Sequence, residues 1–312
     1  MSLKAPRATN RKIRVALVSA RAAQALDEDL PPLIAALQEL AADVQVANWD
    51  DAAVNWRPFD VAVLRSTWDY STRLDEFLQW AQRATRNTLL LNPWPLVRWN
   101  IDKHYLQQLA ERGIAIVPSQ FVEPGDDATL ALDEFLAQHA AAELVVKPAI
   151  GAGSRDAQRH ARGDCAAIIA HMQQLLVSER SVLLQPYLDR VDDYGETALM
   201  FFDGQFSHAI RKGPLLQRGK GSSSRLFAPE QITARAADAA ELELANRVLT
   251  KIPGGIPLYA RVDLLQDATG APCVLELELA EPSLFFAHAP GAAQRFAAQI
   301  VAQVVARGGP RR

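Results

Sequence analysis

The first third of the chain alternates short apolar runs with amphipathic helical patterns. Strands are predicted at IRVALVS, DVQVA, DVAVLRS and TLLLN, with helices near residues 33–40 and 74–86. This order is typical of a parallel sheet with helical crossovers, where ligands bind at the carboxyl ends of the strands. We therefore predict an N-terminal parallel α/β domain over residues 13–99.

The pattern changes after residue 99. Helices are predicted at 102–112 and 128–139, and strands at 115–117 and ELVVKP. From residue 181 onward strands follow one another with few helices: SVLLQPYL, ETALMFFDGQFSHAIRK, YARVDLL and CVLELEL. FFDGQF predicts a hairpin at Asp203 and Gly204, and a last helix is expected over 292–305. The prediction is an α/β fold with α+β character in its C-terminal part, divided at 100–188 and 189–312.

Composition and charge exclude several classes of protein. The chain has 312 residues, 49% of them hydrophobic, and a net charge of -3, which gives no general attraction to nucleic acid. Cys165 and Cys273 cannot form a disulfide framework, and the histidines lack the spacing of a zinc site. Residues 1–12 are predicted to be a disordered lead-in, and no apolar run is long enough for a secretory signal or membrane helix. We expect a cytoplasmic protein whose partners include neither nucleic acid nor membrane.

Acidic residues interrupt the apolar run VLELELAEPSLFF at residues 274–286. Glu276 and Glu278 alternate with apolar residues, so on a strand both point to one side. Arg261 and Asp263 in YARVDLL do the same, and the short connection QDATGAP would let the two strands pair. Pairing would gather three carboxylates and a guanidinium, where Mg²⁺ could relieve the repulsion and bind phosphate oxygens. The alternative is a half-buried strand with a solvated face.

Two stretches are rich in glycine. VVKPAIGAGSRD leads from Lys147 on a strand into a loop with Gly151, Gly153 and Ser154, whose small residues let backbone N–H groups approach an anion. A plain connecting turn is the alternative. GPLLQRGKGSSSR does not fit a P-loop, because five residues instead of four separate its first two glycines. It is predicted to be a mobile lid over residues 213–225 or a disordered loop.

The loop RSTWDY, residues 65–70, leaves a predicted parallel strand at its carboxyl end. It is either an N-capped turn with a packed tryptophan or a loop that contacts the substrate. In the second case Arg65, Trp68 and Asp69 face the substrate. Ser283, in EPSLFF, is predicted to join them.

These motifs, in this order, resemble the ATP-grasp superfamily and within it the glutathione-synthetase-like ligases, from residue 100 to the C-terminal helix. The resemblance implies that ATP is bound by Lys103, Lys147, Gly151, Gly153, Ser154, the adenine hinge Gln185, Pro186, Tyr187 and Leu188, and Glu196. It also implies that Lys212 and Arg261 act on the phosphates and that Asp263, Glu276 and Glu278 bind magnesium. The last ligand is commonly asparagine in the family, so Glu278 is a departure that affects the expected metal geometry.

The combination of RSTWDY, GETALMFFDGQFSHAIRK and LELELAEPSLFF is similar to the cyclo-ligases of D-cycloserine biosynthesis, which close a ring from an O-ureido-serine. The expected function is an ATP- and Mg²⁺-dependent carboxylate–amine ligase that acts through an acyl phosphate on an amino acid or small peptide. It would form a C–N bond and release ADP and phosphate. Two alternatives are a cyclo-ligase on an amino-acid derivative and a non-catalytic ATP-binding regulatory module. One or two Mg²⁺ ions, substitution by Mn²⁺ and a homodimer are left open.

Overall fold

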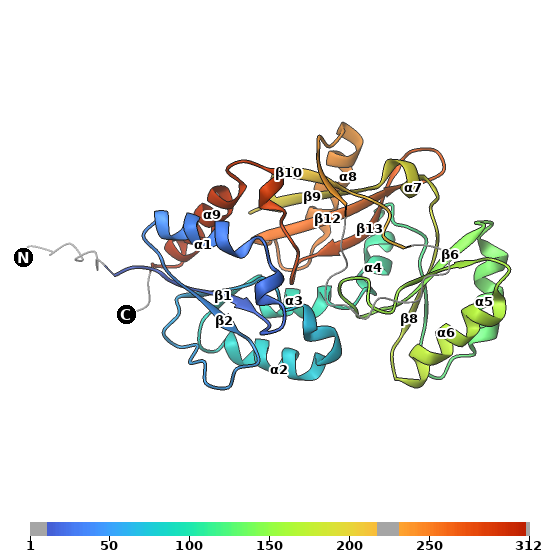
Figure 1. The fold of residues 1–312 in the computed structure, drawn as a ribbon, viewed down its shortest axis with the longest axis horizontal. Helices are drawn as coiled ribbons and strands as arrows, with labels where there is room; N and C mark the ends of the chain where they lie inside the picture. Colours follow the sequence, from blue (N-terminus) through green and yellow to red (C-terminus); the bar gives the residue numbers. More distant parts are fainter. Residues whose placement is uncertain (1–10, 217–230, 310–312) are drawn as a thin grey trace, which may run out of the picture.

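The computed structural model describes residues 11–216 and 231–309. Within them the backbone forms three sheets (Figure 1). The sheet of the N-terminal part lies at one end of the molecule, the second sheet along the chain lies at the other end, and the third lies between them. The predicted fold class, a mixed α/β fold with antiparallel sheets in its later part, is confirmed.

The N-terminal sheet is parallel, with the order β2-β1-β3-β4. Its strands are β1 (Arg14–Ser19), β2 (Asp43–Asn48), β3 (Val61–Leu64) and β4 (Leu89–Leu91). The connections contain η1 (Gln24–Leu26), α1 (Leu30–Glu39), η2 (Trp68–Thr72) and α2 (Leu74–Ala84). Strand β3 is buried along its whole length, which explains its continuous apolar run. The predicted parallel sheet with helical crossovers is therefore confirmed.

The second sheet is antiparallel, with the order β5-β8-β6-β7. Its strands are β5 (Gln120–Val122), β6 (Glu143–Pro148), β7 (Gln158–Ala161) and β8 (Val182–Pro186). Helices α5 (Ala128–Gln138) and α6 (Cys165–Val177) cover its outer face in Figure 1. Phe135 of α5 and Met172 of α6 join Val146 and Leu184 in one core. This leaves the other face of the sheet toward the rest of the molecule.

The third sheet has five antiparallel strands in the order β11-β10-β9-β12-β13. They are β9 (Glu196–Phe202), β10 (Gln205–Lys212), β11 (Ile232–Arg235), β12 (Tyr259–Gln266) and β13 (Pro272–Glu278). The hairpin at Asp203 and Gly204 forms as predicted, with φ of +48° and +75° at the two residues. A Cβ on Gly204 would lie 2.9 Å from a methyl group of Ile256, so this turn requires glycine. The remaining helices are α3 (Trp94–Asn100), α4 (Tyr105–Glu111), α7 (Arg190–Tyr194), α8 (Ala239–Lys251), η3 (Phe286–His288) and α9 (Ala292–Ala306).

The hydrophobic cores cross the predicted domain limits. Leu106 and Leu109 of α4 pack with Val262 and Leu277 of the five-stranded sheet. Phe296 of α9 belongs to a core that joins the N-terminal sheet to the five-stranded sheet. Residues 100–116 and the last helix therefore share cores with more than one sheet, and the limits 13–99, 100–188 and 189–312 stay predictions.

Some elements differ from those expected. The segment 115–117 is no strand, because only a single bridge joins Ile116 to Val274. Helix α8 interrupts the predicted run of strands, and its start carries a capping box between Asp238 and Glu241. That pair is a sequence signal for the helix, and the buried residues Leu244, Ala245, Val248 and Leu249 also recur at helical spacing.

The outer edge of β13 is covered by side chains from the helical region. Asn100 donates to the carbonyl of Leu277 at 2.7 Å and accepts from the N–H of Leu279 at 2.7 Å. The N–H of Leu277 also donates to the Tyr105 hydroxyl at 2.8 Å, and Asn92 donates to the carbonyl of Leu279 at 2.8 Å. An edge strand is thus held in place without a further strand beside it.

Residues 1–10 of the predicted lead-in lie outside the described residues, as do residues 217–225 of the predicted lid. Arg11, near the end of that lead-in, lies 3.3 Å from a carboxylate oxygen of Asp60. Across residues 11–216 and 231–309, no helix combines the length and apolar character needed to cross a membrane.

Replacing Asn100 with alanine should destabilise the protein, because it leaves a buried N–H and a buried C=O of the β13 edge without partners. Each such group costs about 1–3 kcal/mol, so we expect a loss of roughly 2 kcal/mol or more in the free energy of unfolding. Urea denaturation measures this. Asn246→Ala is the matched control, since that exposed amide bonds only within its own helix. Equal stability of the two variants would contradict the role of Asn100.

Candidate functional site

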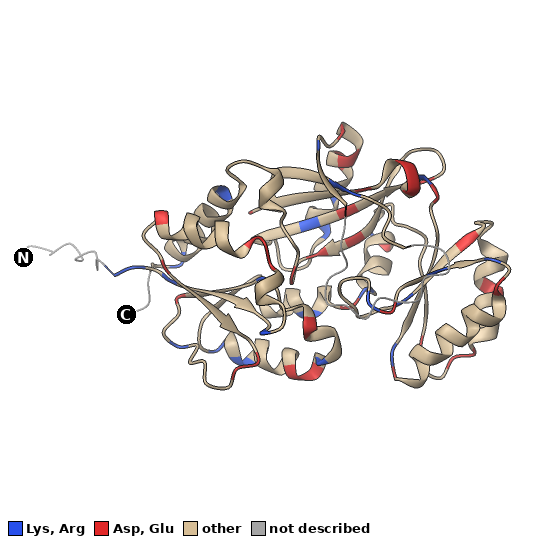
Figure 2. Cartoon of the chain, viewed as in Figure 1, with Lys and Arg blue, Asp and Glu red and all other residues tan. Residues whose placement is uncertain are grey.

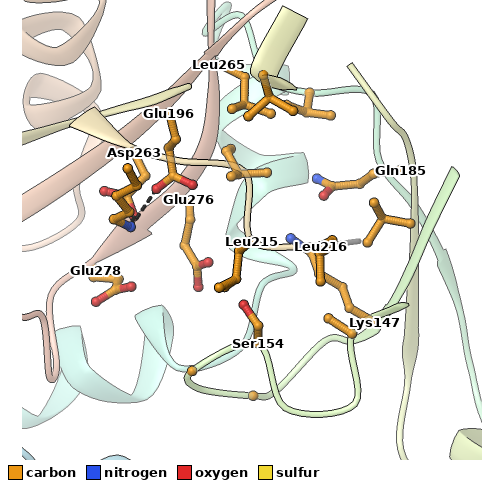
Figure 3. A pocket seen from close by; sticks show the side chains of 18 of the residues that line it. Lys147, Ser154, Gln185, Glu196, Leu215, Leu216, Asp263, Leu265, Glu276 and Glu278 are labelled. Atoms are coloured by element: carbon orange, nitrogen blue, oxygen red, sulfur yellow. Dashed lines mark hydrogen bonds and ion pairs between the residues drawn. The ribbon is translucent and has the colours of Figure 1, made fainter. Parts of the chain in front are cut away.

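A cavity lies between the second sheet and the five-stranded sheet (Figure 3). In Figure 3 Glu276, Glu278 and Asp263 occupy one side, while Lys147 and Gln185 lie on the other. Every residue predicted to bind nucleotide or metal, or to act on phosphates, lines this cavity: Lys103, Lys147, Gly151, Gly153, Ser154, Gln185, Pro186, Tyr187, Leu188, Glu196, Lys212, Arg261, Asp263, Glu276 and Glu278. The fold therefore brings these predicted residues together.

The acidic side of the cavity is built on the pairing of β12 with β13. In this register Arg261 lies opposite Glu278 and Asp263 lies opposite Glu276, as the alternation in the sequence predicts. The register shifts after Asp263, so β13 has one extra residue, Leu275, and both Leu275 and Leu265 line the cavity. The charged face of the strands thus continues into an apolar wall. Figure 2 shows both signs of charge on the strands of this sheet.

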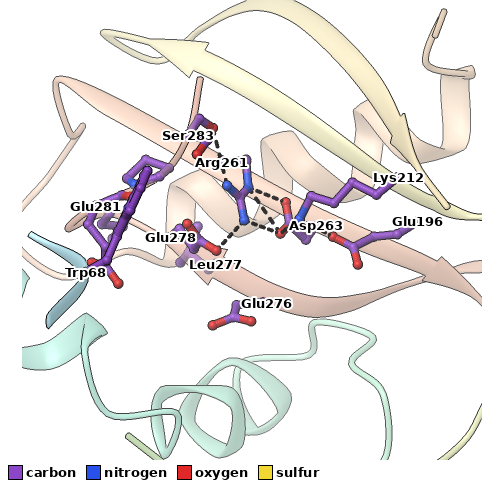
Figure 4. Close-up of polar contacts among 12 residues, drawn as sticks. Trp68, Glu196, Lys212, Arg261, Asp263, Glu276, Leu277, Glu278, Glu281 and Ser283 are labelled. Atoms are coloured by element: carbon purple, nitrogen blue, oxygen red, sulfur yellow. Dashed lines mark hydrogen bonds and ion pairs between the residues drawn. The ribbon is translucent and has the colours of Figure 1, made fainter. Parts of the chain in front are cut away.

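The charged side chains alternate in sign and form ion pairs (Figure 4). Lys212 lies 2.8 Å from Asp263 and 2.5 Å from Glu196. Arg261 contacts both Asp263, at 2.8 Å, and Glu278. The acidic face is therefore not a solvated strand surface, because its carboxylates are held by buried cations inside a cavity.

Lys103 joins the glycine-rich loop to the acidic strand. Its ammonium donates to the carbonyl of Gly151 at 3.0 Å and lies 2.9 Å from a carboxylate oxygen of Glu276. Burial disfavours the charged form of Lys103, but Glu276 more than offsets it, so the pKa of Lys103 stays above its ordinary value. For Lys147 burial dominates and lowers its pKa to about 8, despite the attraction of Glu276.

The carboxylates differ in their protonation behaviour. Burial opposes ionisation of Asp263, but Arg261 and Lys212 outweigh it and hold the Asp263 pKa well below its usual range. For Glu278, burial with the nearby charges of Asp263 and Glu276 raises the pKa to about 8 against the attraction of Arg261. Glu276 has a lowered pKa, because Lys103 and Lys147 overcome the effect of burial. The pKa values of Glu276 and Glu278, two acids on one strand face, are therefore shifted in opposite directions.

The other end of the cavity is apolar. Val117, Val145, Ala157, Leu188, Val191, Leu265 and Leu275 line it, beside the predicted hinge. Arg159 lies over the Tyr187 ring, 3.5 Å from its centroid, and contacts Glu143 and Asp192. These contacts hold the hinge side chain in place at the rim.

The glycine-rich loop has a left-handed backbone at three positions. Gly153, Ser154 and Asp156 have φ of +62°, +56° and +58°. Consecutive left-handed or turn conformations turn backbone N–H groups toward one point, which suits an anion. Gly151, Gly153 and Ser154 all line the cavity at this loop.

Of the predicted substrate residues, Trp68 and Ser283 line the cavity, whereas Arg65 and Asp69 do not. Arg65 is only 1% exposed and donates to the carbonyl of Pro282 at 2.9 Å. Asp69 accepts from the indole N–H of Trp49 at 2.9 Å. Arg65 is therefore bound to the loop after β13 and Asp69 to Trp49 of the N-terminal part, contacts that alternation and strand position could not reveal.

The loop that follows β13 is held by the N-terminal domain. Asp29 accepts hydrogen bonds from the N–H groups of Leu284, Phe285 and Phe286 at 2.6, 3.1 and 2.9 Å. Arg65 lies 3.7 Å from the same carboxylate. Asp29 was not singled out in the sequence, because no local motif marks a residue whose partners lie more than 250 positions away.

Glu281, on this loop, was also missed. It lines the cavity, and the Trp68 indole N–H donates to its carbonyl at 3.0 Å. Burial raises the pKa of Glu281 to about 7, although the Tyr70 hydroxyl and Lys103 favour its charged form. The signal available in the sequence was a third acid in the apolar run, LELELAEP.

The donor set fits magnesium by its chemistry. Asp263, Glu276 and Glu278 offer only carboxylate oxygens, the ligands that Mg²⁺ prefers. In the part of the chain that the structure describes, no three acidic, histidine or cysteine side chains converge on a point where they could hold a metal ion. The ion pairs with Arg261, Lys212 and Lys103 occupy these oxygens instead.

Comparison with known proteins identifies relatives of this chain. The model of the N-terminal domain of D-cycloserine synthetase DcsG matches residues 15–92. The cycloserine biosynthesis protein DcsG of Streptomyces lavendulae is 39% identical over 291 residues, covering 91% of this chain and 96% of the relative. The crystal structure of D-cycloserine synthetase DcsG matches with a TM-score of 0.89 and 38% identity, over 93% of this chain and 99% of that one.

A more distant match shows how far the fold is shared. The ATP-grasp ligase PsnB, solved with a minimal precursor, Mg and ADP, has a TM-score of 0.63 at 16% identity, over 93% of this chain and 98% of that one. The likeness to PsnB shows that the protein has the ATP-grasp fold, as the sequence motifs predict. Within that superfamily the chain belongs to the DcsG family.

Replacing Asp29 with asparagine should loosen the loop at 284–286, because an amide group would face backbone N–H groups that need an acceptor. Hydrogen exchange should speed up at Leu284, Phe285 and Phe286, and the free energy of unfolding should fall by about 1–3 kcal/mol. Asp267→Asn is the control, since that exposed carboxylate also accepts from backbone N–H groups but in a surface turn. Unchanged exchange at all three amides in the Asp29 variant would refute the clamp.

Proposed function

We propose that this ligase uses ATP and Mg²⁺ to phosphorylate a substrate carboxylate and then forms a C–N bond, releasing ADP and phosphate. The observation that carries the proposal is the cavity itself. It has alternating cations and carboxylates at one end, a loop with left-handed backbone in the middle and an apolar wall with a hinge at the other. ATP has matching parts, since its phosphates need cations and N–H groups and its base needs a flat apolar slot.

The nucleotide is proposed to lie with its base between Val145 and Leu265, near the backbone of Tyr187 and Leu188. Its phosphates would then pass Lys147 and the glycine-rich loop toward the acidic end. PsnB, a protein of the same fold, was solved with Mg and ADP, which supports nucleotide and metal binding by this fold.

Asp263, Glu276 and Glu278 are proposed to hold Mg²⁺, with one or two ions and Mn²⁺ as a substitute. When bound, the metal supplies charge neutralisation at the phosphate oxygens. Arg261, Lys212 and Lys103 now hold these carboxylates, and we propose that they turn to the phosphates when the carboxylates take the metal. Each carboxylate would exchange a side-chain cation for the metal, and each cation would exchange a carboxylate for a phosphate. No charge in this group would then be left unpaired in the cavity.

The proposed reaction has two steps, phosphoryl transfer and attack by nitrogen. A carboxylate oxygen of the substrate attacks the γ-phosphorus, and the bond from that phosphorus to the β–γ bridging oxygen breaks as ADP leaves. A nitrogen then attacks the acyl carbon, the bond from that carbon to the phosphate oxygen breaks, and the proton of the nitrogen leaves with the phosphate or solvent. The residues of the chain bind and orient; no side-chain nucleophile is needed.

Membership of the DcsG family favours the cyclising form of this reaction. We propose that the carboxylate and the attacking nitrogen belong to one amino-acid derivative. The test is ADP release with O-ureido-serine alone, compared with amino acids given together with an external amine, and mass spectrometry of the product. ATP binding without any substrate-dependent ADP release would favour a regulatory module.

Lys147 should take up a proton when ATP binds. Its pKa of about 8 leaves it largely neutral at pH 9, and the arriving phosphates should favour its charged form. Calorimetry at pH 9 in buffers of different ionisation enthalpy should give an uptake that approaches one proton, lost in Lys147→Met together with ATP affinity. Lys251→Met, at the end of α8, should keep both. A buffer-independent heat for the wild-type protein would rule out this role.

Glu276→Gln should lower turnover by roughly 100-fold or more, because it removes a carboxylate ligand of the metal that neutralises charge on the phosphates. Higher magnesium should restore part of the rate, and the melting temperature should stay near that of the wild-type protein. Glu243→Gln, on the surface of α8, is the control for a Glu-to-Gln change. Full activity of Glu276→Gln at limiting magnesium would remove the metal site from the proposal.

A further inference from the structure

Glu281 is a buried acid that forms no ion pair among the described residues, although the charges of Lys103 and Arg261 are near enough to favour its charged form. The residue is 8% exposed and lines the cavity. Three cations form the ion pairs of this cavity among the described residues. Lys103 pairs with Glu276, Lys212 pairs with Asp263 and Glu196, and Arg261 pairs with Asp263 and Glu278. None of them includes Glu281, whose carboxylate is hydrogen-bonded by the Tyr70 hydroxyl. A buried carboxylate is costly unless it is paired, so this one is suited to a positive charge brought by a ligand.

The surroundings of Glu281 favour an organic cation. Trp68 lines the cavity and is fixed to the Glu281 carbonyl through its indole N–H, and Figure 4 shows the two together on the side of Glu278 away from Lys212. An indole face attracts an ammonium group, and a single carboxylate accepts its N–H groups.

We propose that Glu281, with Trp68 beside it, binds an ammonium group of the substrate that takes no part in bond formation. The inference rests on the proposed ligase function and names the residues that recognise the amino group of its amino-acid substrate. The Asp29 and Arg65 contacts to residues 282–286 fix the loop that carries Glu281, so the subsite has a set distance from the Arg261–Asp263–Glu278 group. Recognition of this kind selects amino acids over acids that lack the amine.

The test pairs two probes with two variants. O-ureido-serine and its desamino analogue, 3-(ureidooxy)propanoate, are titrated calorimetrically into protein with Mg²⁺ and a non-hydrolysable ATP analogue. The wild-type protein should bind the amine-containing probe about 10- to 100-fold more tightly than the analogue. Glu281→Gln should lose most of this preference while ATP affinity and magnesium dependence stay unchanged. Glu281→Asp should retain part of it, because the charge remains.

Glu196→Gln is the matched control, since it removes an acid at the Lys212 end of the same cavity. It should change nucleotide affinity and keep the preference for the amine. Equal binding of the two probes by the wild-type protein, or an undiminished preference in a folded Glu281→Gln protein, would overturn the inference. ADP release by the wild-type protein distinguishes a failure of the proposed function from a failure of the ammonium subsite. If O-ureido-serine causes no ADP release, the proposed function is contradicted. If it causes ADP release but Glu281→Gln keeps the preference for the amine, only the ammonium subsite is contradicted.

Discussion

The site depends on one strand pairing, that of β12 with β13. Its register sets Arg261 opposite Glu278 and Asp263 opposite Glu276, and a slip by one residue would turn these side chains to the other face. The register is protected from both sides. β9 pairs with β12, and Asn100, Tyr105 and Asn92 satisfy the free edge of β13. The helices before the second sheet therefore act on the site through backbone hydrogen bonds.

Charge pairing follows from that geometry. Four carboxylates and three cations lie on or beside the paired strands, and each cation contacts at least one carboxylate. Such an arrangement is stable only while opposite charges stay balanced, because an unpaired buried charge is costly. A ligand with negative phosphates and a bound cation preserves that balance, and a metal ion alone or a phosphate alone does not. The apolar wall beyond Leu265 and Leu275 then extends the site toward the hinge.

Local patterns in the sequence predicted the acidic face and the glycine-rich loop of this site, whereas Lys103, the hinge, Glu196 and Lys212 followed from the resemblance to the ATP-grasp superfamily. The alternation in YARVDLL and VLELEL gave the shared face, and the spacing of Lys147 from the glycines gave the loop. Contacts between distant segments could not be predicted. Arg65 and Asp69 have the residue types of a substrate loop, yet Arg65 donates to Pro282 in the loop after β13 and Asp69 accepts from Trp49. Asp29 and Glu281 gain their places only when that domain packs on the loop after β13, which no periodicity encodes.

We propose that the carboxylates exchange their protein cations for metal when nucleotide binds. Anomalous X-ray scattering from crystals grown with Mn²⁺ and a non-hydrolysable ATP analogue tests it directly. We expect a manganese peak within coordination distance of Glu276, Glu278 and Asp263, with Lys212 and Arg261 turned toward the phosphates. A metal held by phosphates and water alone, with the Lys212–Asp263 and Lys103–Glu276 pairs intact, would contradict it.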